Sequence, residues 1–321
     1  MSYTNNTDIP LGLAVWLLQD NYDYIHDDNY ISVTELMRPL KQLILGRRNQ
    51  EKRTVDLADL IPSALGNSLH DSIEKAWLTG YDKALNLLGY PESVIDRILI
   101  NPTEDELKTA EDPIPIYLEQ RAYKTVDGFR VGGKFDMVAE GIVQDNKSTS
   151  AYVWVYGGRE DDYRLQGSLY RWLNPTKITE DFIRINYIFT DWQKAQSLQN
   201  PAYPDSRCKF VDITLTSIQD TDRWVKDKLK QIKKYINAPE EELPECTRED
   251  LWMSEPKYKY YADPTKTSGR STKNFTDHAE ALAYQQSRGK GIVITEEGEP
   301  KKCGYCPAFE ICDQRKRYFK S

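Results

Sequence analysis

Long apolar runs are absent from this chain. Its most apolar stretch, residues 9–18, is about half as long as a bilayer-spanning helix, and it lacks the basic flank and small-residue cleavage site of a signal peptide. An excess of positive charge is absent too, since the formal net charge is -7 at pH 7. We therefore expect a cytoplasmic protein of a bacterium or an infected host cell with no membrane partner, whose contacts with nucleic acid are local.

Internal repeats, low-complexity tracts and a P-loop are also missing, so a helicase motor or a recombination protein would be a separate partner. The 321 residues are 39% hydrophobic and 29% charged, which is enough for one elaborated domain or two. From Ala238 onward, Pro, Glu, Lys and Tyr dominate. We expect an N-terminal extension (1–30), a core (31–237) and an accessory module (238–321).

Hydrophobic periodicity predicts the order of helices and strands. Ser32 and Glu35 form a capping box that opens a helix with Leu36, Leu40, Leu43 and Ile44 on one side. A second helix is expected at 63–88. Strands are predicted at 116–126, 129–139, 142–148, 152–156, 182–190 and 209–215, and further helices at 160–173, 218–236 and 277–287.

The strands at 129–139 and 142–148 form a predicted hairpin around the turn Glu140-Gly141. It brings Asp136 near Asp145 and Lys147, which share one face of the second strand. Two carboxylates and an ammonium can hold a magnesium or manganese ion beside a water that the lysine orients or deprotonates. The alternative is a solvated strand end, because a D-x-K tripeptide is expected about once by chance in a charged chain of this length.

Three side chains on the predicted helices could join this site. His70 lies on a helix that would pack against the sheet, where it is either structural or a metal ligand. Gln166 and Tyr170 are four residues apart and share one helix face. They contact the active site or a nucleic-acid backbone, unless Tyr170 is simply a core residue with a solvated hydroxyl.

The order His70, Asp136, Asp145-x-Lys147, Gln166-x3-Tyr170 resembles the PD-(D/E)XK nuclease superfamily. The trailing Q-x3-Y is similar to the RecB-type exonuclease branch. The resemblance covers roughly residues 30–215 and rests on the agreement of several weak motifs. It implies an α/β fold with a restriction-endonuclease-like core, in which helices flank a mixed central sheet.

The resemblance also implies roles for single residues. His70, Asp136 and Asp145, with the backbone carbonyl of Asn146, would bind one or two Mg²⁺ or Mn²⁺ ions, and Lys147 would position or activate the water. Gln166 and Tyr170 would support the site or the substrate strand. Glu119, in the preceding strand, is either an auxiliary carboxylate or a salt-bridged strand residue.

Cysteine is scarce, with five in the chain, but three form the C-x2-C-x5-C pattern Cys303, Cys306 and Cys312, with Cys246 upstream. In a reducing cytoplasm these suggest a metal centre rather than disulfides. Together with the resemblance, the CGYCP context favours a 4Fe-4S cluster, and zinc remains the alternative.

The family places its first cluster cysteine before the core, whereas no cysteine here precedes Cys208. We assign Cys246 as the fourth ligand and expect Cys208 to be a buried free thiol, although Cys208 could take its place. The result would be a metal-stapled, cysteine-rich C-terminal extension.

Two groups of basic residues are candidate DNA-binding surfaces or ordinary solvated helix faces. The first group is Arg38, Lys41, Arg47, Arg48, Lys52 and Arg53, and the second is Lys226, Lys228, Lys230, Lys233 and Lys234.

The leading hypothesis is a metal-dependent deoxyribonuclease, an exonuclease that resects DNA ends in recombination, repair or DNA turnover. A catalytically silent DNA-binding or assembly subunit with the same fold is the alternative, and the intact D-x-K argues against it. A sequence-specific endonuclease ranks lower, because the Q-x3-Y motif resembles end-processing relatives and no recognition domain is visible. The motifs do not determine polarity, strand preference or oligomeric state, a homo-oligomer included.

Overall fold

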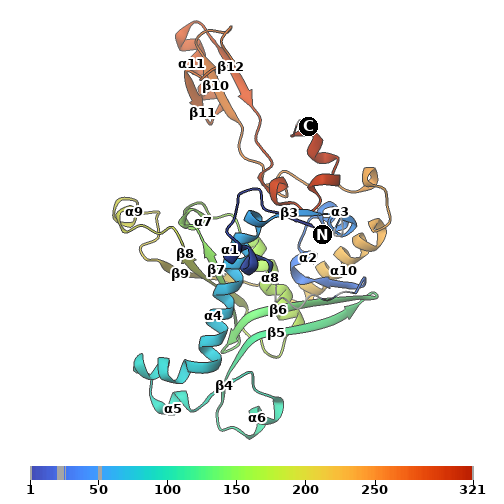
Figure 1. Ribbon diagram of the computed structural model, residues 1–321, viewed down its shortest axis with the longest axis vertical. Coiled ribbons are helices and arrows are strands. Elements are labelled where there is room, and N and C mark those ends of the chain that lie inside the picture. The colour runs from blue at the N-terminus through green and yellow to red at the C-terminus, as the bar shows by residue number, and fades with distance from the viewer. Residues whose placement is uncertain (1, 20–24, 26, 50–52, 320–321) are drawn as a thin grey trace. The chain divides into compact units, whose positions relative to one another are not determined.

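The computed structural model describes residues 2–19, 25, 27–49 and 53–319, which form two compact units (Figure 1). The first unit consists of Met1–Arg38 with Thr54–Lys233, and the second of Pro39–Arg53 with Lys234–Ser321. Each unit is therefore built from two separate stretches of chain. The sequence division placed residues 39–53 in the core, but their packing partners lie in the C-terminal module.

The elements of the first unit are listed here in chain order. They are β1 (Ser2–Thr4), α1 (Leu11–Leu18), β2 (Tyr30–Ser32), α2 (Val33–Leu36), β3 (Thr54–Asp56), α4 (Leu57–Leu87), α5 (Glu92–Ile95), β4 (Ile98–Ile100), α6 (Glu104–Thr109), β5 (Ile114–Val126), β6 (Phe129–Ala139), β7 (Ile142–Thr149), α7 (Ala151–Tyr156), α8 (Glu160–Leu173), β8 (Phe182–Phe189), α9 (Lys194–Gln199), β9 (Cys208–Thr214) and α10 (Ile218–Tyr235). Among the described helices, none is both long and apolar enough to cross a membrane.

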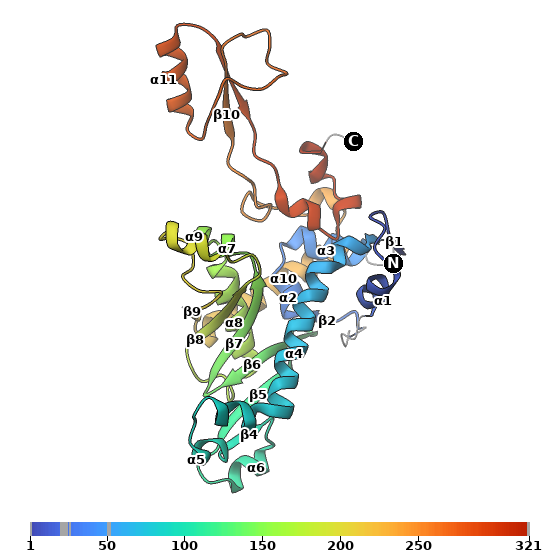
Figure 2. The same cartoon turned by 60° about the vertical axis from the view of Figure 1, so that its left-hand side comes forward.

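A mixed, curled sheet with helices along it organises this unit (Figures 1 and 2). Its strand order is β4-β5-β6-β7-β8-β9, and β2 pairs with β6 outside this path. The pairs β5–β6, β6–β7 and β8–β9 are antiparallel, whereas β4–β5 and β7–β8 are parallel. The parallel β7–β8 pair needs a crossover, and α7 and α8 supply it. The α/β class expected from the sequence is confirmed.

Two tight turns set the register of the central strands. Asp127-Gly128 joins β5 to β6, and Glu140-Gly141 joins β6 to β7. All four residues have positive φ angles, between 50° and 87°, as the two-residue hairpin turns that match the strand twist require. The predicted turn at Glu140-Gly141 is thus confirmed, and with it the register that aligns the acidic residues.

Three local predictions were wrong. The helix capped by Ser32 stops after one turn, because Pro39 separates α2 from the next helix, α3 (Leu40–Asn49). The second helix begins at Leu57 rather than residue 63, since Asp56 caps it by accepting a hydrogen bond from the Ala58 N–H at 3.1 Å.

The expected strand 152–156 is the helix α7. Its valines and aromatic residues favour β-structure locally. Ser150 nevertheless caps a helical turn, and its hydroxyl accepts a hydrogen bond from the Tyr152 N–H at 3.1 Å. Aromatic packing against β8 then stabilises that turn.

The second unit contains α3, a small sheet and several short 3₁₀ turns. Its remaining elements are η1 (Glu240–Glu242), β10 (Lys257–Tyr261), β11 (Lys273–Phe275), α11 (His278–Arg288), β12 (Ile292–Glu296), η2 (Lys301–Tyr305), η3 (Phe309–Ile311) and η4 (Gln314–Arg317). The antiparallel sheet β11-β10-β12 packs on α11, where the Tyr284 ring lies 5.1 Å from that of Tyr260. The predicted helix α11 is confirmed. The three strands were not predicted, because their alternating Lys and Tyr residues did not stand out as a strand pattern.

Candidate metal centre

The hairpin β6–β7 opens at the point where its acidic residues lie. Cross-strand pairing extends as far as Met137 and Gln144. Beyond that pair the Asp136 carboxylate takes the place of a strand partner, and its Oδ2 accepts a hydrogen bond from the Asn146 N–H at 3.0 Å. The Asp136 carboxylate thereby accepts the hydrogen bond of the Asn146 N–H, in place of a backbone carbonyl of β6.

His70 reaches the same backbone from α4. Its Nε2 donates to the Asn146 carbonyl at 3.0 Å, and its Nδ1 lies 3.2 Å from Asp136 Oδ2. Both ring nitrogens face oxygen atoms, and only the doubly protonated imidazolium can donate to both. The hydrogen bond to Asp136 accordingly raises the pKa of His70. The two N–H groups of His70 thus join it to Asp136 and to the Asn146 carbonyl, and the sequence predicts all three groups to be metal ligands.

Asp145 is the most deeply buried carboxylate of the centre, with 2% of the residue exposed. Its Oδ1 accepts a hydrogen bond from Gln166 Nε2 at 3.0 Å, and the same nitrogen lies 3.1 Å from the Tyr170 hydroxyl. Lys147 Nζ lies 2.6 Å from Oδ2, so the ammonium faces the second oxygen, which accepts no other hydrogen bond from the described residues. Asp145 therefore has one oxygen anchored by Gln166 and one oxygen paired with Lys147.

Burial and the short distance between Asp145 and Lys147 determine the charge state of both groups. Burial raises the pKa of the Asp145 carboxyl, because the charged form loses hydration. Burial by itself lowers the pKa of Lys147, but the Asp145 carboxylate acts in the opposite direction and the net pKa is raised. Lys147 is consequently an ammonium at neutral pH, suited to donating hydrogen bonds rather than removing protons.

Two glycines let α8 approach the sheet closely enough for Gln166 and Tyr170 to reach the centre. A Cβ added to Gly167 would lie 2.8 Å from Ile183 of β8, and one added to Gly133 would lie 3.1 Å from the Tyr170 ring. Both distances are shorter than ordinary carbon contacts. The sequence predicted the shared helix face, and these glycines explain how that face reaches Asp145.

Glu119 is the third member of the tightest acidic group in the described part of the chain. Ligand atoms of His70, Glu119 and Asp136 all lie within 4.8 Å of one another. Glu119 has a φ of 48°, a costly conformation for a residue with a side chain. Lys134 Nζ lies 2.5 Å from its carboxylate. The salt-bridged role considered for Glu119 is therefore confirmed, and its role as an auxiliary carboxylate stays a prediction. The motifs did not point to Lys134, which the structure places at this acidic group.

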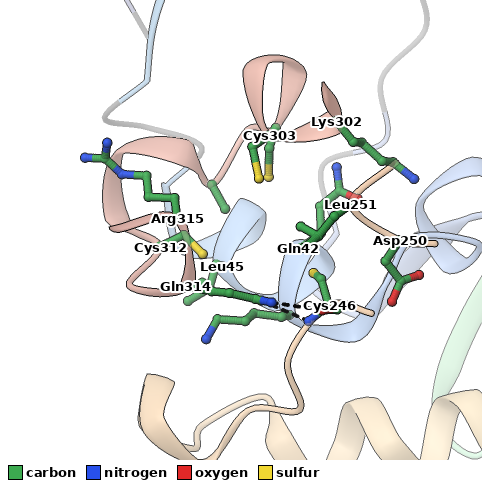
Figure 3. A pocket seen from close by; sticks show the side chains of 13 residues that line it. Gln42, Leu45, Cys246, Asp250, Leu251, Lys302, Cys303, Cys312, Gln314 and Arg315 are labelled. Atoms are coloured by element: carbon green, nitrogen blue, oxygen red, sulfur yellow. Dashed lines mark hydrogen bonds between the residues drawn. The ribbon is translucent and has the colours of Figure 1, made fainter. Parts of the chain in front are cut away.

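Four cysteines line a pocket of the second unit (Figure 3), namely Cys246, Cys303, Cys306 and Cys312. Gln314 fixes the first of these, since its side chain accepts from the Cys246 N–H at 2.9 Å and donates to the Cys246 carbonyl at 2.8 Å. Among the described residues, no three sulfurs lie within 4.8 Å of one another. The thiols surround the pocket without forming a compact cluster.

Burial raises the pKa of the Cys246 thiol to about 12 and that of Cys303 to about 11. These thiols therefore keep their protons unless a metal displaces them. Cys208 does not line the pocket. It lies at the start of β9 in the first unit and is exposed, so the expectation of a buried thiol was wrong. The alternating strand turns this position towards solvent.

The basic groups are largely engaged in structural contacts. In the first group, Lys41 is buried against Glu240 at 3.1 Å, and Arg48 donates to the carbonyl of Ile236 at 3.0 Å. Lys52 lies outside the described residues. In the second group, Lys226 pairs with Asp222 at 2.7 Å. Neither group forms a uniformly free basic face.

Comparison with known proteins gives little support for any family. No protein-family profile and no curated protein matches the chain. Among solved structures, the chain is similar to the crystal structure of SSO0001, with 15% sequence identity, 71% of this chain and 87% of that chain covered, and a TM-score of 0.42. The function of the centre is therefore inferred from its own residues.

Proposed function

We propose that this chain is a metal-dependent nuclease that hydrolyses DNA phosphodiester bonds, acting from DNA ends as an exonuclease. One observation carries the proposal. His70 from α4, Asp136 from β6 and the buried Asp145–Lys147 pair from β7 meet around the backbone of Asn146. Imidazole, two carboxylates, a carbonyl and an ammonium are the groups that metal-assisted phosphodiester hydrolysis needs.

The donor set suits Mg²⁺ or Mn²⁺, because oxygen ligands predominate and an imidazole is added. The Oδ2 of Asp145 supports this assignment, because it lies beside the Lys147 ammonium and accepts no hydrogen bond from a described backbone or amide group that an ion would have to displace. His70, Asp136, Asp145 and the Asn146 carbonyl would hold the ion, with Glu119 beside them. When bound, the ion would lower the pKa of a water molecule and stabilise charge on a phosphoryl oxygen.

The remaining residues orient these groups. Lys147 presents its ammonium towards the scissile phosphate and the attacking water, and donates hydrogen bonds to both. Gln166 is a positioning residue, because it fixes Asp145 through Oδ1. Tyr170 in turn lies against the Gln166 amide. This arrangement resembles the supporting contacts that orient metal ligands in other proteins.

For the second unit, we infer that the four pocket cysteines hold a 4Fe-4S cluster. The pocket brings all four of these cysteines around one space, and the C-x2-C-x5-C spacing with its CGYCP context favours the cluster. Zinc on the same four thiolates is the alternative. The visible absorption spectrum of protein purified without oxygen distinguishes the two, because only the cluster is coloured.

The nuclease proposal is tested on linear and circular DNA with Mg²⁺ or Mn²⁺. We expect degradation of the linear form alone, with Mn²⁺ at least as effective as Mg²⁺ because of the imidazole ligand. Asp136→Asn and Lys147→Met should slow it about a hundredfold or more. Glu140→Gln, in the exposed turn of the same hairpin, is the matched control and should cleave at the parent rate.

Equal cleavage by the parent and both site variants would show that the assignment is wrong. Calorimetric titration with Mn²⁺ gives a second readout. If the protein binds DNA but no divalent ion in the first unit, the alternative of a silent DNA-binding subunit replaces the nuclease proposal.

A further inference from the structure

Helix α7 carries two exposed tyrosines whose rings lie against each other at a tilt. Tyr152 is 61% exposed and Tyr156 is 68% exposed. They are four residues apart on one helix face, and their ring centroids are 4.1 Å apart with an angle of 32° between the rings. Rings of this size normally contribute to a core or an interface, so a solvent-facing pair suggests a binding surface.

The opposite face of α7 anchors this pair. The Trp154 ring packs edge-on against Tyr187 at 5.8 Å and Phe189 at 6.0 Å, both on β8. At the start of the helix, the Ala151 N–H donates to Asp191 at 2.7 Å. The helix is therefore held on the sheet while its two tyrosines face away from it.

The tyrosine pair is connected to the metal centre by sequence and by packing. Lys147 lies on β7, and α7 begins at Ala151, only a few residues later in the chain. Its ammonium lies 5.8 Å from the centre of the Tyr163 ring, and that ring lies 6.4 Å from Tyr187. Since Tyr187 also contacts Trp154, an unbroken series of rings joins the lysine to α7. A strand whose phosphate reaches Lys147 would bring its neighbouring bases towards this surface.

We propose that Tyr152 and Tyr156 form a stacking platform for an unpaired base of single-stranded DNA beside the scissile phosphate. The inference rests on the proposed nuclease function and assigns its substrate class. The paired rings present an exposed aromatic face on which a base can stack. Bases inside a duplex already stack on their neighbours, so the platform favours a single-stranded or frayed end.

The test measures binding of a single-stranded oligonucleotide that contains 2-aminopurine, whose fluorescence falls when the base stacks. Binding is measured with Mg²⁺ in the Asp136→Asn background, where cleavage is slow. Stacking contributes roughly 1–3 kcal/mol per base, so the double change Tyr152→Ala and Tyr156→Ala should raise Kd roughly tenfold or more and abolish the quenching. The double change to Phe keeps both rings and should stay within about twofold.

Tyr90→Ala is the matched control, because Tyr90 is 51% exposed in the same unit; it should leave Kd unchanged, as should a duplex ligand with any of the variants. Equal Kd and equal quenching in the double-alanine protein would overturn the platform, as would absence of single-strand binding by the background protein. A dimer that dissociates in the double-alanine variant while DNA binding persists would make this face a contact between copies instead. Because quenching needs no cleavage, its result is independent of whether the parent protein cuts DNA.

Discussion

The acidic centre and the cysteine pocket are both candidate metal sites, but they are prepared to different degrees. In the first unit, the charges already compensate one another through His70–Asp136, Lys147–Asp145 and Lys134–Glu119. In the second, burial keeps the Cys246 and Cys303 thiols protonated, and their sulfurs are spread around the pocket. The side chains of the first site hold one another in place, whereas the second site would depend on the metal proposed for it.

Because of this difference, we expect the two sites to respond differently to loss of an ion. A centre whose ligands are held by hydrogen bonds on a sheet and two helices loses chemistry without losing its fold. A pocket that joins α3 to distant loops through thiols loses folding free energy when the metal leaves.

The largest expected change in activity follows from the loss of Asp145. Replacing Asp145 with Asn removes a proposed metal ligand and leaves Lys147 without its carboxylate. We expect cleavage of linear DNA to fall about a thousandfold, because an ion contributes several kcal/mol to the transition state. The metal content of the cysteine pocket should be unchanged. Loss of both metals in this variant, measured by elemental analysis, would mean that the two sites do not differ as described.

The next effect is on the free energy of unfolding, and it distinguishes Cys246 from Cys208. Cys246→Ser should abolish metal binding in the pocket and destabilise the second unit by on the order of 5 kcal/mol or more. Cys208→Ser should change stability by less than about 0.5 kcal/mol, because this thiol is exposed. Visible absorption and thermal melting measure both. The reverse pattern would return Cys208 to the ligand set.

The smallest effect concerns Gln166, which contacts a proposed metal ligand but is not a ligand itself. Gln166→Leu removes the hydrogen bond to Asp145 Oδ1 and leaves that oxygen unsatisfied. We expect Mn²⁺ affinity to fall roughly 10- to 100-fold, as for other residues that orient metal ligands. Tyr170→Phe should have a weaker effect. Unchanged affinity in Gln166→Leu, by calorimetry, would remove Gln166 from the centre.

The sequence predicted those parts of the molecule that depend on local signals. Glu140-Gly141 permits one turn geometry, and that turn determines the register of β6 and β7. Helix α8 was predicted because its apolar positions repeat at helical spacing. Asp136, Asp145, Lys147 and His70 could therefore be named in advance, although their chemistry stays a prediction.

Features that depend on distant contacts could not be predicted in this way. Helix α7 was mistaken for a strand, because its local preference for β-structure is outweighed by packing against β8. The pairing of Lys134 with Glu119 requires knowledge of which strands are neighbours. Residues 39–53 gave no sign that they belong with the C-terminal module, since the groups they contact, such as Glu240 and Pro307, are far away in sequence.

The discontinuous second unit has a consequence for synthesis of the chain. Helix α3 leaves the ribosome early, with side chains at Leu43, Ile44 and Leu45 that end almost fully buried. The residues that this helix contacts in the same unit, such as Glu240 and Pro307, are translated much later. At about 5–20 residues per second this apolar helix waits on the order of ten seconds or more. During that interval it is a natural target for a chaperone, or a nucleus for aggregation.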